Sequence, residues 1–318
     1  MIFEKQVVNM YKGMMHTRCD DTETVFYFSA EDFPGLMAEA YQFASSEGHT
    51  LQGYIYRYDS PLPNRLVVFD HGFGGGHRAY MKEIEKLCSH GYTVFAYDHT
   101  GCMESGGNTP GGLAHSLCDL NDCINTIKAD ARFAGYDISV MGHSWGAFST
   151  LNITALHPDI SHIVAMCGFV SVEEMIKTFF SGMLKGYRGA VLDLERASNP
   201  KFVDFNAVKT LSESKTKALL IYSEDDQMCK RVHYDILKAE LEGRENVRFI
   251  LCKNKGHNPN YTEDAVKLLG EFAKKRAKIA RNKKATAEDK KRFVESFDWN
   301  AMTVQDDDVW NTIFEHLA

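Results

Sequence analysis

The chain has 318 residues, of which 44% are hydrophobic and 25% charged, a composition typical of a globular protein with a sizeable core. A formal net charge of −7 argues against nucleic acid or an anionic membrane surface as a partner. The N-terminal residues lack the apolar run of a signal peptide, and no stretch has the length and hydropathy of a transmembrane helix.

The predicted elements begin with an antiparallel hairpin over residues 41–58, followed by alternating strands and helices. We expect strands at 66–69, 93–97, 138–141, 162–167, 218–222 and 247–252. We expect helices at 80–89, 113–127, 232–241 and 263–273, and a further helix that begins directly after Ser144. Nearly continuous apolar strands separated by helices predict an α/β fold, with a mostly parallel central sheet and helices on both faces.

One interval, residues 171–214, breaks this alternation and carries two apolar rows at helical spacing. We interpret it as a helical cap inserted into the core, which then comprises residues 1–170 and 215–280 with an N-terminal extension over 1–40. The apolar rows predict that Phe179, Phe180 and Met183 bind substrate, although the same face could instead pack on the body of the protein.

Residues 281–318 are predicted to form a C-terminal helical tail. The basic stretch 274–292 is expected to be a solvated helix face rather than a nucleic-acid patch, because the whole chain is acidic. Val309, Ile313 and Leu317 have the spacing of a helix face that docks on the body.

The eight cysteines are scattered, and no two of them have CxxC spacing. Without that spacing a zinc site is not expected, and no histidine spacing suggests a metal site either. Reduced, buried thiols are typical of cytoplasmic proteins, so we expect a cytoplasmic location.

The clearest motif is Gly142-x-Ser144-x-Gly146, placed between a predicted strand and a predicted helix. This is the pattern of a nucleophile elbow, a turn so sharp that glycines are needed on both sides of the serine. The turn holds the serine hydroxyl clear of the carboxyl edge of the sheet, where the following helix N-terminus favours developing negative charge. Ser144 is therefore the candidate nucleophile.

A serine nucleophile needs a base, and the base needs an acid that orients it. Asp225 and Asp226 follow one later strand directly, and His257 follows the next strand. Both turns should lie at the same sheet edge as Ser144, and the chain order serine, acid, histidine is the one expected for this elbow.

A glycine-rich loop, His71-Gly72-Phe73-Gly74-Gly75-Gly76, follows the first of the parallel strands. It lacks the lysine and serine of a phosphate-binding loop, and its glycine spacing does not fit a dinucleotide site. We expect the backbone N–H groups of Phe73 and Trp145 to form an oxyanion hole.

In order and spacing, the segments HGFGGG, YDHTGCMESGG, GHSWG, SEDD and GH resemble the α/β-hydrolase superfamily, and most of all the capped esterases and lysophospholipases similar to monoacylglycerol lipase. The resemblance covers about residues 42–273. Two positions depart from the family pattern: Cys102-Met103 stand where a glycine is usual, and Ser223 replaces the glycine that opens the acid turn. Counting from Ser223, the family turn selects Asp226 as the acid.

Some family members carry the acid after the preceding strand, where this chain has Glu173 and Glu174. The resemblance implies a serine hydrolase that cleaves a carboxylic ester of a small or medium apolar acyl group through an acyl-enzyme. It needs no cofactor, because water completes the reaction. A peptidase, a thioesterase, an acyltransferase or a slow ligand-binding homologue could use the same residues.

Overall fold

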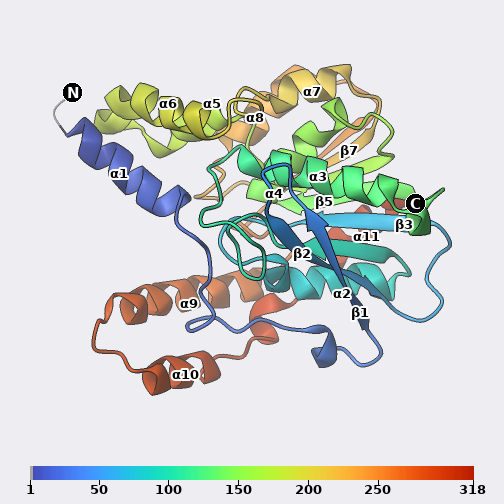
Figure 1. The fold of residues 1–318 in the computed structure, drawn as a ribbon, viewed down its shortest axis with the longest axis horizontal. Coiled ribbons are helices and arrows are strands. Elements are labelled where there is room, and N and C mark those ends of the chain that lie inside the picture. The colour runs from blue at the N-terminus through green and yellow to red at the C-terminus, as the bar shows by residue number, and fades with distance from the viewer. Residues whose placement is uncertain (1–2) are drawn as a thin grey trace.

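The apolar strands assemble into one eight-stranded sheet in the computed structural model, which describes residues 3–318 (Figure 1). The strand order is β1-β2-β4-β3-β5-β6-β7-β8. β1 (Met37–Ala44) and β2 (Thr50–Arg57) form the expected hairpin, and β2 pairs antiparallel with β4. All other neighbouring strands are parallel, so the predicted α/β fold with a mostly parallel central sheet is confirmed.

The expected strands and helices of the core are present, with ends that shift by a few residues. The later strands are β3 (Arg65–Asp70), β4 (Thr93–Tyr97), β5 (Asp137–His143), β6 (His162–Met166), β7 (Lys217–Ser223) and β8 (Val247–Cys252). The helices that cover them are α2 (Met81–Ser89), α3 (His115–Ala129), α4 (Trp145–Asn152), α8 (Val232–Leu241), α9 (Glu263–Arg281) and α11 (Asp307–Leu317).

Side chains that alternate along each parallel strand divide the core into two layers. Val68 belongs to the layer with α3 and α4, whereas Val67 and Phe69 belong to the layer with α2 and α11. Ile313 and Leu317 of α11 are fully buried, so the predicted docking of the tail is confirmed.

The interval 171–214 contains α5 (Val172–Phe179), a 3₁₀ helix (Gly182–Tyr187), α6 (Arg188–Ser198) and α7 (Ala207–Glu213). A helix that the sequence did not predict, α1 (Glu4–Met15), lies beside α6 (Figure 1). The hydroxyl of Tyr11 donates to the buried carboxylate of Glu195 at 2.7 Å, and its ring lies 6.0 Å from that of Phe180. α1 therefore covers part of the apolar face that the sequence assigned to substrate.

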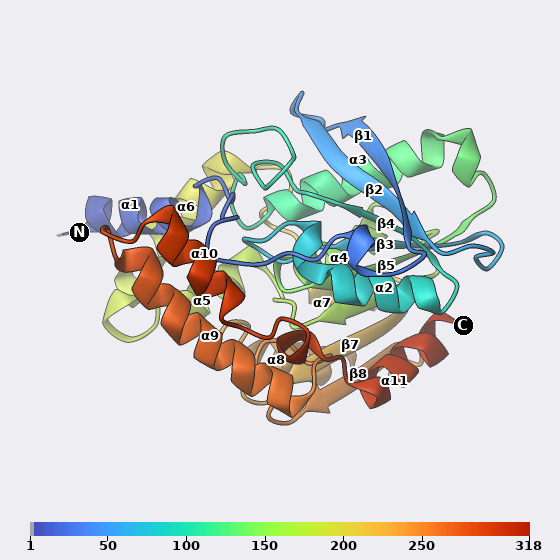
Figure 2. The ribbon, with the colours of Figure 1, turned by 90° about the horizontal axis from the view of Figure 1, so that it is seen from below.

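At the other end of the chain, α9 continues beyond its predicted end to Arg281 and is followed by α10 (Ala287–Glu295), which packs beside it (Figure 2). Phe272 of α9 stacks with Phe293 of α10 at 5.8 Å. The segment that follows α1 leads away from the cap interval and reaches α9 (Figure 1). There Arg276 of α9 donates to Asp21 of this segment at 2.6 Å. Among the described residues, no helix combines the length and the apolar character needed to cross a bilayer.

Candidate active site

Ser144 lies at the sharp turn from β5 into α4, with a φ of 56° that non-glycine residues rarely adopt. Both flanking glycines are required by close contacts. A Cβ atom on Gly146 would collide with the carbonyl of Asp70 in β3, and one on Gly142 would collide with the side chain of Thr150. The packing of strand against helix thus explains the motif, and the strained serine points its hydroxyl away from the sheet.

The base and the acid meet Ser144 at the carboxyl edge, where β7 and β8 end. His257 Nε2 lies 2.8 Å from Ser144 Oγ, and His257 Nδ1 lies 2.8 Å from Asp226 Oδ2. Asp226 is almost fully buried, and its other oxygen accepts the backbone N–H groups of Met228 and Cys229. The three side chains therefore form a continuous hydrogen-bonded chain of the kind that activates a serine.

The other candidate acids point elsewhere. Asp225 is exposed, and its carboxylate accepts the Ser223 hydroxyl at 2.6 Å and the N–H of Gly256 at 3.1 Å. It therefore fastens the acid turn to the loop that carries His257. Glu173 and Glu174 both pair with Lys177 at 2.8 Å, away from the histidine.

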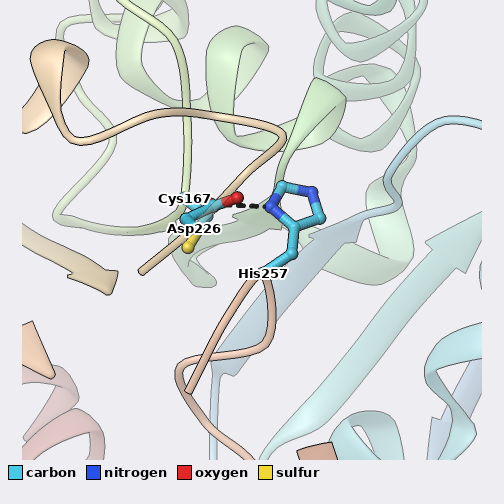
Figure 3. A group of neighbouring side chains, drawn as sticks. All are labelled: Cys167, Asp226 and His257. Atoms are coloured by element: carbon cyan, nitrogen blue, oxygen red, sulfur yellow. Dashed lines mark hydrogen bonds and ion pairs between the residues drawn. The ribbon is translucent and has the colours of Figure 1, made fainter. Parts of the chain in front are cut away.

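Figure 3 shows Cys167 beside the acid and the base, and one potential ligand atom from each of the three lies within 4.8 Å of the others. A metal would need the thiolate of Cys167, but burial raises the pKa of this thiol well above its usual value. The imidazole Nδ1 is also already engaged by Asp226. The cluster therefore has the chemistry of a histidine and its orienting acid rather than of a metal centre.

The glycine-rich loop between β3 and α2 lies against Trp145, the residue that follows the serine. Gly74 and Gly76 have φ values of 107° and 62°, which explains why glycine stands there. Within residues 3–318, neither the N–H of Phe73 nor that of Trp145 donates a hydrogen bond, and the two rings pack 5.2 Å apart. Neither N–H group is therefore occupied by an acceptor among the described residues.

A hydrogen-bonded chain that the sequence did not reveal joins this loop to the base. The Gly72 N–H donates to the Tyr80 hydroxyl at 3.0 Å, which lies 2.8 Å from His143 Nδ1, and His143 Nε2 lies 2.6 Å from the carbonyl of His257. Burial, with the nearby charge of His257, lowers the pKa of His143 to about 3, so its ring is neutral. Because a carbonyl can only accept, Nε2 carries the proton and Tyr80 donates to Nδ1.

Charged groups lie buried beneath the loop. The ring of His99 lies between Asp70 at 2.7 Å and Asp119 at 3.2 Å. Burial opposes the charge, but the two carboxylates outweigh it and raise the pKa of His99 to about 9. The neighbouring His71 behaves oppositely, because burial and the charge of His99 lower its pKa to about 3. The neutral ring of His71 accepts a hydrogen bond from the backbone N–H of His99 and donates one to the carbonyl of Gly72. These two bonds fix the start of the glycine-rich loop.

A cavity of about 630 Å³ adjoins His257 and the glycine-rich loop. None of the three residues predicted to bind substrate lines it. Phe180 is buried beside Tyr11, Phe179 is half-buried against the same core, and the side chain of Met183 is 99% exposed. These three side chains therefore do not line this cavity, and their role in binding substrate stays a prediction.

Comparison with known proteins adds a family match and a shared fold. Residues 61–248, which include Ser144 and Asp226, match the model of the family described as serine aminopeptidase, S33. The chain is 25% identical over 255 residues to the uncharacterized protein YqkD of Bacillus subtilis (strain 168), covering 74% of this chain and 77% of that protein.

Two solved structures illustrate the shared fold. The Pyrococcus furiosus esterase Pf2001 aligns with a TM-score of 0.61 and 19% identity over 82% of this chain and 98% of that chain. Acetyl xylan esterase 1 from Thermoanaerobacterium sp. JW/SL YS485 aligns with a TM-score of 0.53 and 14% identity over 86% of this chain and 93% of that chain. At these identities the likeness concerns the fold of the chain.

Proposed function

This chain belongs to the serine aminopeptidase S33 family of α/β-hydrolase serine hydrolases, and we propose that it acts as an esterase on carboxylic esters with a small or medium apolar acyl group. The observation that carries the proposal is the chain of hydrogen bonds from Ser144 through His257 to Asp226. We propose the cytoplasm as its location, where the eight free cysteines would stay reduced.

In the proposed mechanism, Ser144 Oγ attacks the ester carbonyl while His257 Nε2 takes the hydroxyl proton. Asp226 keeps the proton of the imidazole on Nδ1 and stabilises the imidazolium. The N–H groups of Phe73 and Trp145 bind the oxyanion. Nε2 then gives its proton to the departing alcohol oxygen, and the carbon–oxygen bond to the alcohol breaks.

The second half of the reaction uses the same groups. Water attacks the acyl-enzyme, His257 takes a proton from it, and Ser144 regains that proton as the carboxylic acid leaves. One water is consumed for each ester cleaved, and the enzyme returns to its starting state. In this proposal Ser144, His257 and Asp226, with the two N–H donors, take part in both halves of the reaction.

The charges around the cavity favour an ester over a peptide with a free amino terminus. An aminopeptidase must hold a positively charged amino group, which calls for a carboxylate near the reacting carbonyl. Among the described residues, the charged side chains that line the cavity with His257 are Arg78 and Arg276, and no carboxylate joins them. The lining of the cavity therefore offers no carboxylate partner to a cationic amino group.

A fluorophosphonate probe tests the nucleophile. We expect mass spectrometry to find the label on Ser144 alone, and Ser144→Ala to lower the turnover of methyl acetate by roughly a thousandfold or more. Ser212→Ala, a change at an exposed serine of α7, should keep both label and turnover. Label on another residue, or full turnover in Ser144→Ala, would refute the proposal.

A further inference from the structure

The cavity beside His257 is formed by three parts of the chain that lie far apart in sequence. The glycine-rich loop forms one side, residues 25–28 form the second, and residues of α9 together with Trp299 and Thr303 form the third. Two of the three parts lie outside the family match of residues 61–248. Its volume of about 630 Å³ lies in the range of small-molecule binding sites.

The wall formed by the second and third parts, which we call the terminal wall, is aromatic. Rings of residues far apart in sequence contact one another there: Phe26 lies 5.9 Å from Trp299, and Phe272 lies 4.9 Å from Trp299. Leu269 adds an aliphatic surface. Stacking and burial against such a wall favour a flat or bulky apolar group.

Polar contacts fasten the two halves of the terminal wall to each other. The guanidinium of Arg276 donates to the carboxylate of Asp21 at 2.6 Å and to the hydroxyl of Thr24 at 3.1 Å. Lys290 of α10 also pairs with Glu23, and within the first segment the hydroxyl of Tyr27 donates to the carbonyl of Asp21 at 2.9 Å. The wall is thus a built surface rather than a chance gap beside a loop.

The position of the cavity indicates which half of an ester it receives. His257 lines it, whereas Ser144 does not. In acyl transfer the serine bonds to the acyl carbon, while the histidine hands its proton to the leaving oxygen. A space that opens at the histidine therefore lies where the alcohol half departs.

We propose that the terminal wall binds the alcohol half of the substrate, and that the enzyme prefers esters of primary alcohols that carry an aromatic or bulky apolar group. This proposal rests on the proposed esterase function. It assigns specificity to Leu269, Phe272 and Trp299 rather than to the cap interval 171–214.

The test varies the alcohol while the acyl group stays acetyl. Methyl, butyl, benzyl and 2-naphthylmethyl acetates all release primary alcohols, so their intrinsic reactivities are similar. For the wild-type protein we expect kcat/KM to rise at least tenfold from methyl to 2-naphthylmethyl acetate, as burial of an aromatic ring would give. Trp299→Ala should remove most of this rise and leave methyl acetate within about twofold of wild type.

A second pair of variants separates an effect of the cavity from an effect of misfolding. Leu269→Trp fills the cavity and should reject 2-naphthylmethyl acetate while still cleaving methyl acetate. Leu268→Ala changes the preceding residue of α9, which lies outside the cavity lining and is 38% exposed. It should leave the whole alcohol series as in wild type.

A parallel series of methyl esters, from acetate to hexanoate, identifies the half of the ester involved. The proposal is overturned if Trp299→Ala and Leu269→Trp leave the alcohol preference unchanged, or if they alter the acyl series instead. If the wild-type protein showed no Ser144-dependent turnover of methyl acetate, the esterase function itself would be refuted. The two failures are therefore distinguishable.

Discussion

The catalytic edge of the sheet and the terminal wall are held together in different ways. At the edge, each side chain stands in a short turn after a strand of the sheet, so the backbone hydrogen bonds of β5, β7 and β8 fix Ser144, Asp226 and His257. The wall depends on side-chain contacts between two distant segments, and its ion pair of Asp21 with Arg276 is about one-third exposed on each side. The residues proposed for bond cleavage and those proposed for substrate selection are therefore held in place by separate sets of contacts.

The largest expected effect concerns the catalytic edge alone. Asp226→Asn should lower kcat by a factor of about 10⁴ for every ester, because an amide cannot hold the histidine tautomer. Asp225→Asn, one position away, should lower kcat only severalfold, because it weakens the turn and leaves the acid in place. Steady-state kinetics on methyl acetate decide between them, and equal losses would show that the acid is wrongly assigned.

A smaller effect tests the hydrogen-bonded chain between loop and base. Tyr80→Phe keeps the ring in the cavity but leaves the Gly72 N–H and His143 Nδ1 without their partner. A buried unpaired group costs about 1–3 kcal/mol, so we expect kcat to fall roughly tenfold to a hundredfold for small and bulky esters alike.

Tyr27→Phe is the matched control for this change. It removes a hydroxyl that bonds to the carbonyl of Asp21 within the N-terminal segment of the terminal wall, so it should affect only bulky alcohols. If Tyr80→Phe were as active as wild type on methyl acetate, the chain from Gly72 to His257 would have no part in positioning the base.

The smallest expected effect concerns the wall alone. Arg276→Gln breaks a partly exposed ion pair, which is worth about 0.2–1 kcal/mol, so KM for 2-naphthylmethyl acetate should rise by less than about fivefold. High salt should also raise the KM of the wild-type protein for 2-naphthylmethyl acetate, because salt screens such ion pairs.

Lys267→Gln provides the control for charge, because it removes a well-exposed cation from the same helix. It should leave KM for both methyl and 2-naphthylmethyl acetate unchanged. A rise of KM for methyl acetate in Arg276→Gln would mean that the edge and the wall are coupled after all.

The parts of the site that could be predicted from the sequence are those determined by local geometry. Gly142 and Gly146 reveal the elbow because no other residue fits against its neighbours. The order of Asp226 and His257 along the chain follows from the parallel sheet. The strand predictions succeeded for the same reason, because a buried parallel strand is apolar along its whole length.

What the sequence did not reveal depends on pairing between distant residues. Nothing near Asp21 indicates Arg276 as its partner, and nothing near Tyr80 indicates His143. α1 was missed because its apolar pattern is weak: of its residues, only Tyr11 and Met15 are buried. That omission also left out the neighbour of Phe180 in the cap interval, whose ring packs beside Tyr11.

The ion pair between Asp21 and Arg276 spans 255 positions of the chain, and this separation has a consequence for biosynthesis. At translation rates of about 5–20 residues per second, Asp21 waits roughly 10 to 50 seconds for its partner to be made. Phe26 waits longer still, because Trp299 follows Arg276. A growing chain therefore contains its nucleophile, acid and base before the residues that complete its terminal wall and its core have been made.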